Sequence, residues 1–380
     1  MKKQILIFAF SLVAVSARCE IEAVWLTYNT NAPTGIVLNW TTSSPSAASV
    51  DYGTTESRGA KINSADKKTL HYAEIPISNA ESEIFYKISD DTGAEFSAKI
   101  NRLPASENFR AVIIGNLGYA KNPDFRAIEA DRPDIVFTCG DNVPMLHENG
   151  KWDGSMKPFA AAIKKFPRRL LASTPLMPIS GNHDKEIRPR GKKYPKEASY
   201  DPSAAGFKEF FKLPDSGSYW KFAVPQYGVT FLGIDVCHIY DYGTTWQACS
   251  PFGADSRQYV WYKGQVENRQ TPFVFTLMNE RNQDMRKTKG KIWEAEFSKT
   301  SGVVSGFGYY LERAETGGVK FYNTSLNAGD KYPDVFSKFI KAEGGYLLLT
   351  FAKGKDVRAD LKSLAGEVLD SSAIKPLSSR

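Results

Sequence analysis

The segment Ser180-Gly181-Asn182-His183-Asp184 directly follows the apolar residues 175–179, and Gly140-Asp141 directly follows the apolar run 135–139. In both places a predicted buried strand ends in a glycine and then in polar side chains. Ligands of open α/β sheets bind at the carboxyl ends of the strands, where such side chains converge. These two segments therefore predict a ligand crevice that contains Asp141, Asn182 and His183.

The chain from residue 107 to residue 370 alternates predicted strands with predicted helices. The predicted strands are Phe109–Ile114, Asp134–Cys139, Val229–Val236 and Phe273–Leu277, and the predicted helices are Pro123–Ala130, Met156–Phe166 and Tyr259–Asn268. More strand ends carry polar or small residues, namely Asn116, Asn279 and Gly306. The pattern predicts an α/β domain over 107–370 with a site at one edge of its sheet.

Residues 20–104 have a different sequence pattern, in which predicted short strands such as Gly35–Trp40, Ala48–Gly53 and Ile84–Ile88 are separated by predicted turns. This spacing predicts a small β-sandwich. Pro104 and small residues interrupt the strand pattern between Arg102 and Ser106, which predicts a linker there.

The first seventeen residues have the layout of a secretory signal peptide. Lys2 and Lys3 precede the apolar run Ile5–Val15, and small residues lead up to Ala17. The alternative is a membrane anchor, but the run is shorter than the roughly 20 apolar residues that span a bilayer. We therefore expect a signal peptide over 1–17, no membrane span, and a secreted or periplasmic protein.

Charge and cysteine content exclude some classes of protein. The formal charge of +7 is spread along the chain, and no nucleic-acid motif accompanies the basic clusters, so we expect no nucleic-acid partner. The sequence has four cysteines, too few for a disulfide framework in an exported chain of 380 residues. Cys237 and Cys249 flank one loop, and a disulfide between them remains open.

The order of the strand ends resembles the metallophosphoesterase superfamily, the calcineurin-like phosphoesterases, and within it the purple acid phosphatase-like group. Trp40-Thr41-Thr42 and Val50-Asp51-Tyr52-Gly53 resemble that group's N-terminal fibronectin-type domain. The resemblance implies a four-layer α/β/β/α domain preceded by a small all-β fibronectin-type sandwich over 20–104. It also implies a dinuclear site of Fe, Zn or Mn, in which paired cations neutralise the charge of the phosphoryl oxygens.

Three residues match the superfamily's site motifs. The resemblance implies that Asp141 is the bridging carboxylate and that Asn182 is a metal ligand through its carbonyl oxygen. His183 would donate a proton to the leaving group.

The other motif positions depart from the family pattern. Asn116 stands where the family has aspartate, Pro144 where it has tyrosine, and Asn279 where it has histidine. Phe307 and Tyr309 stand where the family has two further histidines. Asn116 and Asn279 still offer an oxygen each, but the loss of a carboxylate and of imidazoles predicts no metal or a weakly held divalent metal.

The sequence thus predicts an exported purple acid phosphatase-like homologue that is inactive or strongly impaired in phosphoester hydrolysis. One alternative is an active phosphoesterase that hydrolyses phosphate monoesters through a rewired or mononuclear site. Its additional ligand would be recruited from His147, His238, Asp184 and Glu280. We expect His147 and His238, however, to be surface or loop imidazoles. A second alternative is an envelope- or carbohydrate-binding module that uses aromatic residues at 240–246 and 261–262. The expected partner is a small phosphorylated substrate if the protein is active, and otherwise an envelope or extracellular ligand.

Overall fold

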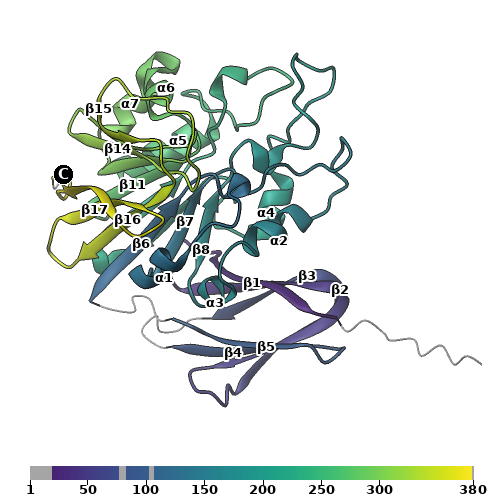
Figure 1. The fold of residues 1–380 in the computed structure, drawn as a ribbon. Helices are drawn as coiled ribbons and strands as arrows, with labels where there is room; N and C mark the ends of the chain where they lie inside the picture. The colour runs from purple at the N-terminus through teal and green to yellow at the C-terminus, as the bar shows by residue number, and fades with distance from the viewer. Residues whose placement is uncertain (1–18, 77–82, 102–106, 379–380) are drawn as a thin grey trace, which may run out of the picture.

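The computed structural model describes residues 19–76, 83–101 and 107–378 (Figure 1). The predicted signal peptide and the predicted linker lie outside these ranges. Among the helices that are described, none is both long and apolar enough to cross a membrane.

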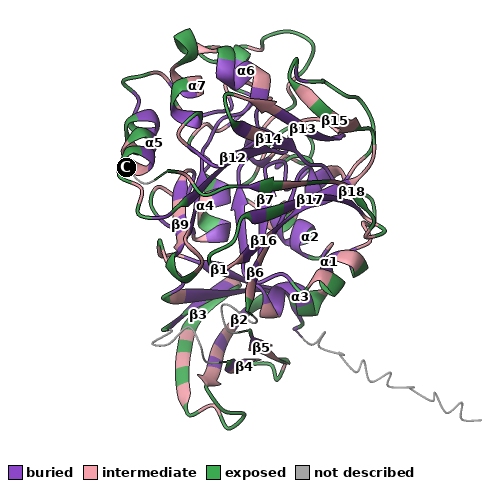
Figure 2. Cartoon of the chain, turned by 90° about the vertical axis from the view of Figure 1, so that its left-hand side faces the viewer, coloured by how far each residue is buried: buried purple, intermediate pink, exposed green. Residues whose placement is uncertain are grey.

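The described residues before position 102 form an all-β sheet. Its strands are β1 (Ile21–Tyr28), β2 (Gly35–Gly53), β3 (Ala60–Pro76), β4 (Ile84–Asp90) and β5 (Glu95–Ile100). They pair in the order β1-β2-β4-β5, and β3 also pairs with β2. Figure 2 shows that the far end of the β2–β3 hairpin is exposed, whereas the sheets of the rest of the chain are mostly buried.

Strand β2 differs from the sequence prediction of two short strands with a turn between them. Residues 35–53 form one strand, and the predicted turn is an irregularity in the β2–β3 register between Thr41 and Ala48. Pro45 lies inside it, and since proline has no N–H to donate to the ladder, it is tolerated at such a bulge. The first part of β2 pairs with β1 and the last part with β4, so this strand connects both ends of the sheet.

The remaining strands form two sheets. One has the order β18-β17-β16-β6-β7-β8 and the other β15-β13-β14-β12-β11-β10-β9. The first contains β6 (Asn108–Ile114), β7 (Ile135–Cys139), β8 (Leu176–Ile179), β16 (Gly345–Ala352), β17 (Val357–Ser363) and β18 (Val368–Ile374). The second contains β9 (Trp220–Val224), β10 (Val229–Gly233), β11 (Phe273–Met278), β12 (Gly302–Ser305), β13 (Leu311–Thr316), β14 (Val319–Asn323) and β15 (Ser337–Lys341).

A cluster of phenylalanine rings joins the two sheets. Phe231 of β10 packs against Phe137 of β7, with ring centroids 4.5 Å apart, and against Phe351 of β16 at 6.0 Å. Phe109 of β6 contacts both Phe231 and Phe351. These rings are buried, and burial of such large apolar surfaces is the main stabilising term of the core.

Short helices connect the strands. They are α1 (Arg126–Asp131), α2 (Lys157–Ile163), α3 (Arg168–Ser173), α4 (Ala205–Phe211), α5 (Arg257–Glu267), α6 (Asn282–Lys287) and α7 (Ile292–Phe297). The predicted helices at 123–130, 156–166 and 259–268 correspond to α1, α2 and α5, with shifted ends. Tyr262 of α5 and Trp293 of α7 are fully buried in one cluster with Val274 and Phe321 of the second sheet.

The N-terminal sheet packs directly on the α/β part. Trp25 of β1 stacks on Phe210 of α4, with ring centroids 4.3 Å apart and planes inclined by 10°. The hydroxyl of Tyr86 donates a hydrogen bond of 2.9 Å to the carbonyl oxygen of Ala172 in α3. One buried apolar cluster runs through both parts of the chain, so they share a core.

All four cysteines lie within the described residues, and each is a buried free thiol. The disulfide that the sequence left open between Cys237 and Cys249 is therefore not formed in this structure. Burial raises the pKa of the Cys249 thiol to about 12, so it stays protonated at neutral pH.

Candidate functional site

A cavity of about 170 Å³ lies at the carboxyl ends of β6, β7 and β8. Four residues that the sequence predicted for the site line it, namely Asn116, Asp141, Asn182 and His183. The other lining residues come from later loops and are His238, Phe307, Gly308, Tyr309, Asp330 and Tyr332. Asn279 is buried just beneath, against Gly140 and Gly181.

Glycines let the loops approach one another at the base of this cavity. A Cβ at Gly181 would lie 2.2 Å from Oδ1 of Asp141, and one at Gly140 would lie 2.5 Å from the side chain of Asn279. Gly140 and Asp141 also have positive φ angles, of 79° and 51°. Glycine at 140 and 181 is therefore required by the packing of the strand ends, whatever chemistry the site performs.

The side chain of Asn116 is turned toward the backbone. Its amide nitrogen donates hydrogen bonds to the carbonyl oxygens of Gly306 and Gly308, at 2.7 and 2.5 Å. These two acceptors fix the orientation of the amide, because its carbonyl oxygen would be repelled there. The position that carries the first acidic ligand in the family thus supplies a hydrogen-bond donor in this chain.

Asn279 behaves in the same way. Its amide nitrogen donates to the carbonyl oxygen of Cys139 at 2.8 Å and, more weakly, to that of Gly306 at 3.3 Å. Asn116 and Asn279 therefore converge on the same carbonyl of Gly306 and tie together the loops after β6, β7, β11 and β12.

Asp141 has a different environment. Its residue is 8% exposed, and within the described part of the chain its carboxylate accepts one hydrogen bond, from the backbone N–H of His183 at 3.4 Å. No lysine or arginine of that part forms an ion pair with it. A buried carboxylate with so few partners leaves most of its lone pairs available to a ligand.

His183 is held by two neighbours. Its Nδ1 lies 2.9 Å from Oε2 of Glu186, and the hydroxyl of Tyr119 lies 3.1 Å from either ring nitrogen. Burial lowers the pKa of His183, but the charge of Asp141 and the hydrogen bond with Glu186 outweigh burial and raise it. A protonated imidazole at the cavity is chemically suited to donate a proton, which is the role that the family motif implies for it.

His238 lines the cavity but is oriented unfavourably for a metal. Nη1 of Arg190 lies 3.0 Å from its Nδ1, and since arginine can only donate, Nδ1 accepts and the neutral ring carries its proton on Nε2. Burial and the charge of Arg190 lower the pKa of His238, which favours this neutral form. A protonated Nε2 has no lone pair to give to a cation.

The other residues considered as replacement ligands are used elsewhere. His147 lies in the loop between β7 and α2, as expected, but its side chain is only 9% exposed and lies against Glu186, with Nε2 and Oε1 3.6 Å apart. Asp184 is fully buried and accepts hydrogen bonds from the N–H groups of Gly181 and Asn142. Glu280 accepts from the N–H groups of Ile239 and Arg281.

The two buried carboxyls respond to burial in the same direction. Desolvation, with the charge of Asp141 as a second cause, raises the pKa of Asp184 to about 7, and desolvation raises the pKa of Glu280 to about 7. The carboxyl groups of Asp184 and Glu280 accept hydrogen bonds from backbone N–H groups and so hold the loops around the cavity in place.

The donor set does not fit a pair of divalent cations. Metal pairs require several carboxylates and imidazoles that converge on one point. In the ranges that the structure describes, no group of three or more His, Cys, Asp and Glu side chains is placed to hold a metal ion. Asn116 and Asn279 each offer at most one uncharged amide oxygen, since their nitrogens donate to backbone carbonyls, and Phe307 has no donor atom.

Several residues of the cavity were missed by the sequence reasoning. Glu186 lies one helical turn after His183, a spacing that could have indicated a partner for the imidazole. Tyr119 likewise ends the 3₁₀ turn Leu117–Tyr119 that follows Asn116. Asp330 and Tyr332 lie in the irregular loop between β14 and β15, where no periodicity marks them.

The aromatic residues proposed for a carbohydrate surface are divided. Tyr240 is 76% exposed and Tyr242 is 38% exposed, but Tyr262 is fully buried against Trp293. Trp246 packs between Tyr194 and the guanidinium group of Arg190. Tyr262 belongs to the core, so the expectation that residues 261–262 form one contact surface is wrong for this residue.

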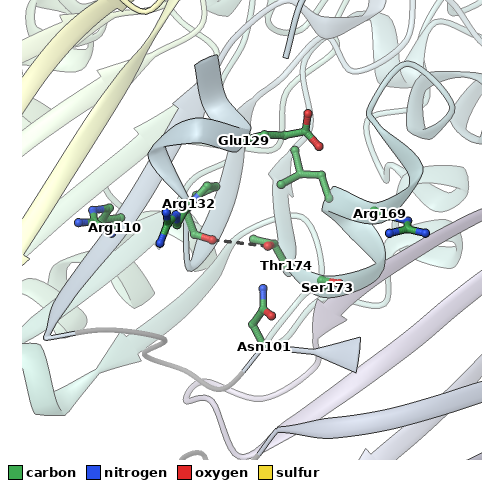
Figure 3. A pocket seen from close by; sticks show the side chains of 9 residues that line it. Asn101, Arg110, Glu129, Arg132, Arg169, Ser173 and Thr174 are labelled. Atoms are coloured by element: carbon green, nitrogen blue, oxygen red, sulfur yellow. Dashed lines mark hydrogen bonds between the residues drawn. The ribbon is translucent and has the colours of Figure 1, made fainter. Parts of the chain in front are cut away.

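A second hollow, of about 390 Å³, lies near the amino ends of β6, β7 and β8, whereas the candidate site lies at their carboxyl ends (Figure 3). Pro133 and Thr174, which line it, precede β7 and β8, and Arg110 lies near the start of β6. Figure 3 shows Arg110 and Arg132 on one side of this hollow and Arg169 on the other. Because the ligand crevice of an α/β sheet lies at the carboxyl ends, this basic hollow is distinct from the candidate site.

Comparisons with known proteins identify the family of this chain. The family model described as calcineurin-like phosphoesterase matches residues 114–306, just over half of the chain, from the end of β6 to Gly306. The comparison with curated proteins gave no match.

Two solved structures have a similar fold. A purple acid phosphatase, PPD1, from seeds of yellow lupin (Lupinus luteus) is 14% identical, with a TM-score of 0.69, over 93% of this chain and 74% of that one. A structure of PhoD is 11% identical, with a TM-score of 0.62, over 92% of this chain and 88% of that one. At these identities the similarity shows the fold and not the activity. The fold, the order of the strand ends and the match over 114–306 together show that this chain belongs to the calcineurin-like phosphoesterase family.

Proposed function

We propose that this protein is a calcineurin-like phosphoesterase homologue that does not hydrolyse phosphoesters by the two-metal mechanism and uses the inherited cavity to bind a ligand. The observation that carries the proposal is the pair of amides at Asn116 and Asn279. Each is a neutral amide whose nitrogen donates to backbone carbonyl oxygens, so it offers a cation at most one uncharged oxygen in place of a carboxylate or an imidazole.

The charge of the cavity supports the same conclusion. Asp141 and Asp330 both line it, and Glu186 lies behind His183. These three carboxylates outnumber the protonated imidazole of His183 and repel the oxygens of a phosphate group at close range. If no phosphoester binds, His183 has no leaving group to which it could donate a proton.

A reduced, mononuclear site is the second candidate, because His238 lies in the same cavity as Asp141 and Asn182. Its use as a ligand requires that the imidazole release Arg190 and change its tautomer, since Nδ1 now accepts from that guanidinium. Arg190 also forms an ion pair with Asp241 at 2.7 Å, which holds it in place.

Metal loading followed by a phosphatase assay tests the proposal. Protein purified without chelator is incubated with Mn²⁺, Zn²⁺ or Fe²⁺, its metal content is measured by elemental mass spectrometry, and release of p-nitrophenol from p-nitrophenyl phosphate is followed. We expect less than stoichiometric metal and no release above the uncatalysed rate. Metal-dependent release that Asp141→Ala abolishes in a folded protein would overturn the proposal.

The finer fold assignment and the location are proposals of the same kind. We infer that residues 20–104 form a fibronectin-type sandwich and that the two larger sheets with their flanking helices form a four-layer α/β/β/α domain. The rings that join β7, β10 and β16 support the second assignment. Export is supported by the layout of residues 1–17 in the sequence.

A further inference from the structure

The cavity at the strand ends has more negative than positive charge. Asp141 is 8% exposed and lines it, and in the described part of the chain its carboxylate has a single long hydrogen bond and no ion pair. Asp330 lines the same cavity, and the single charge of His183 is shared between Asp141 and Glu186, whose Oε2 lies 2.9 Å from its Nδ1. Since a buried charge without a partner is costly, this arrangement favours a positively charged ligand.

Aromatic side chains form part of the lining of the cavity. Phe307, Tyr309 and Tyr332 line it, and Tyr332 is 42% exposed. The rings of Phe307 and Tyr332 meet at 72°, with centroids 5.6 Å apart, and Tyr119 contacts Tyr309 at 66° and 6.3 Å. The face of an aromatic ring attracts a cation, and the guanidinium group of Arg281 already lies over the ring of Tyr332, 5.4 Å from its centroid.

The size and the donors of the site distinguish between cations. Metal ions need several oxygen or nitrogen ligands in their coordination shell, and among the described residues no group of three or more His, Cys, Asp and Glu side chains is placed to supply them. An organic ammonium group needs a nearby carboxylate and aromatic faces, both of which are present. A cavity of about 170 Å³ is smaller than a typical drug-sized pocket, so it suits a small head group.

We propose that this cavity binds a small organic ammonium ion, with Asp141 as its counter-ion and with Phe307, Tyr309 and Tyr332 around it. The inference rests on the proposed function, because a resident metal pair would occupy the same place. It names the class of ligand that the inherited site accepts once phosphate chemistry is lost.

Isothermal titration calorimetry with choline chloride on chelator-treated protein tests this inference. We expect saturable binding of one equivalent. Asp141→Asn should weaken binding about tenfold or more, because it removes the counter-ion, and Tyr332→Leu should weaken it by about threefold or more. Tyr332→Phe keeps the ring and should bind as the parent protein does.

Two controls separate the charge of the site from general effects. Asp356→Asn removes an exposed carboxylate that does not line the cavity. It lies in the loop between β16 and β17, and its loss should leave binding unchanged. The neutral isostere 3,3-dimethylbutan-1-ol has the shape of choline without its charge and should bind at least about tenfold more weakly. Circular dichroism and thermal melting of each variant verify that it is folded.

Three results would overturn the inference: no saturable binding of choline, equal binding of the neutral alcohol, or undiminished binding to folded Asp141→Asn. The phosphatase assay is run on the same preparation with metal in place of chelator. Metal-dependent hydrolysis would refute the proposed function, whereas the choline titration in chelator reports separately on the ammonium site.

Discussion

Replacing Lys185 with methionine will lower the free energy of unfolding by about 3–5 kcal/mol, because it leaves the carboxylate of Asp235 buried without its counter-ion. Both side chains are fully buried, and the ammonium group of Lys185 donates to Asp235 and, at 2.9 Å, to the carbonyl oxygen of Ala248. Burial lowers the pKa of Lys185, but the charge of Asp235 outweighs it and raises the pKa. The measurement is urea-induced unfolding followed by tryptophan fluorescence.

The double variant Lys185→Met/Asp235→Leu is the matched control for this prediction. It removes both charges, and since a buried pair is often replaceable by apolar residues, it should recover most of the stability lost in Lys185→Met. The hydroxyls of Ser250 and Ser180, which donate to Asp235, would lose an acceptor and limit the recovery. A single variant as stable as the parent would show that the pair contributes nothing.

Replacing Trp25 with alanine will also destabilise the protein by about 3–5 kcal/mol, the usual cost of deleting a large buried aromatic side chain. The indole is fully buried and stacks on Phe210, so its loss opens a cavity between the N-terminal sheet and α4. We expect a lower unfolding midpoint and faster limited proteolysis between the two parts of the chain.

Trp25→Phe is the control for the ring itself. The indole nitrogen of Trp25 is buried and has no hydrogen-bond partner among the described residues. A phenylalanine keeps a stacked ring and removes this unpaired N–H, so part of its smaller size is offset. If Trp25→Ala were no less stable than Trp25→Phe, the contact between the two parts would not contribute to the fold.

The sequence allowed the framework of the α/β part to be predicted because buried strands have a simple signature. The strands at 109–114, 135–139 and 273–278 are runs of apolar residues, each followed by a glycine or an asparagine. Their ends converge as an open sheet requires, which brings Asn116, Asp141 and Asn182 together.

The other features of the fold and of the site could not be predicted, because they depend on tertiary contacts that leave no local sequence pattern. The predicted turn in β2 is a bulge because neighbouring strands continue the ladder past Pro45. The tautomer of His238 is decided by Arg190, far away in the sequence. Tyr332 reaches the cavity from an irregular loop, where neither periodicity nor a motif could place it.

The hydrogen bonds of Asn116 also constrain how this lineage can evolve. A single reversion to aspartate would set a carboxylate against the carbonyl oxygens of Gly306 and Gly308, which now accept from the amide at 2.7 and 2.5 Å. The added oxygen would be unfavourable without a cation to separate the oxygens, and Asn279 offers such a cation only one neutral oxygen while Phe307 offers no donor atom. If the proposed function holds, a substitution at position 116 alone is therefore not enough to restore a metal site, and several positions would have to change together.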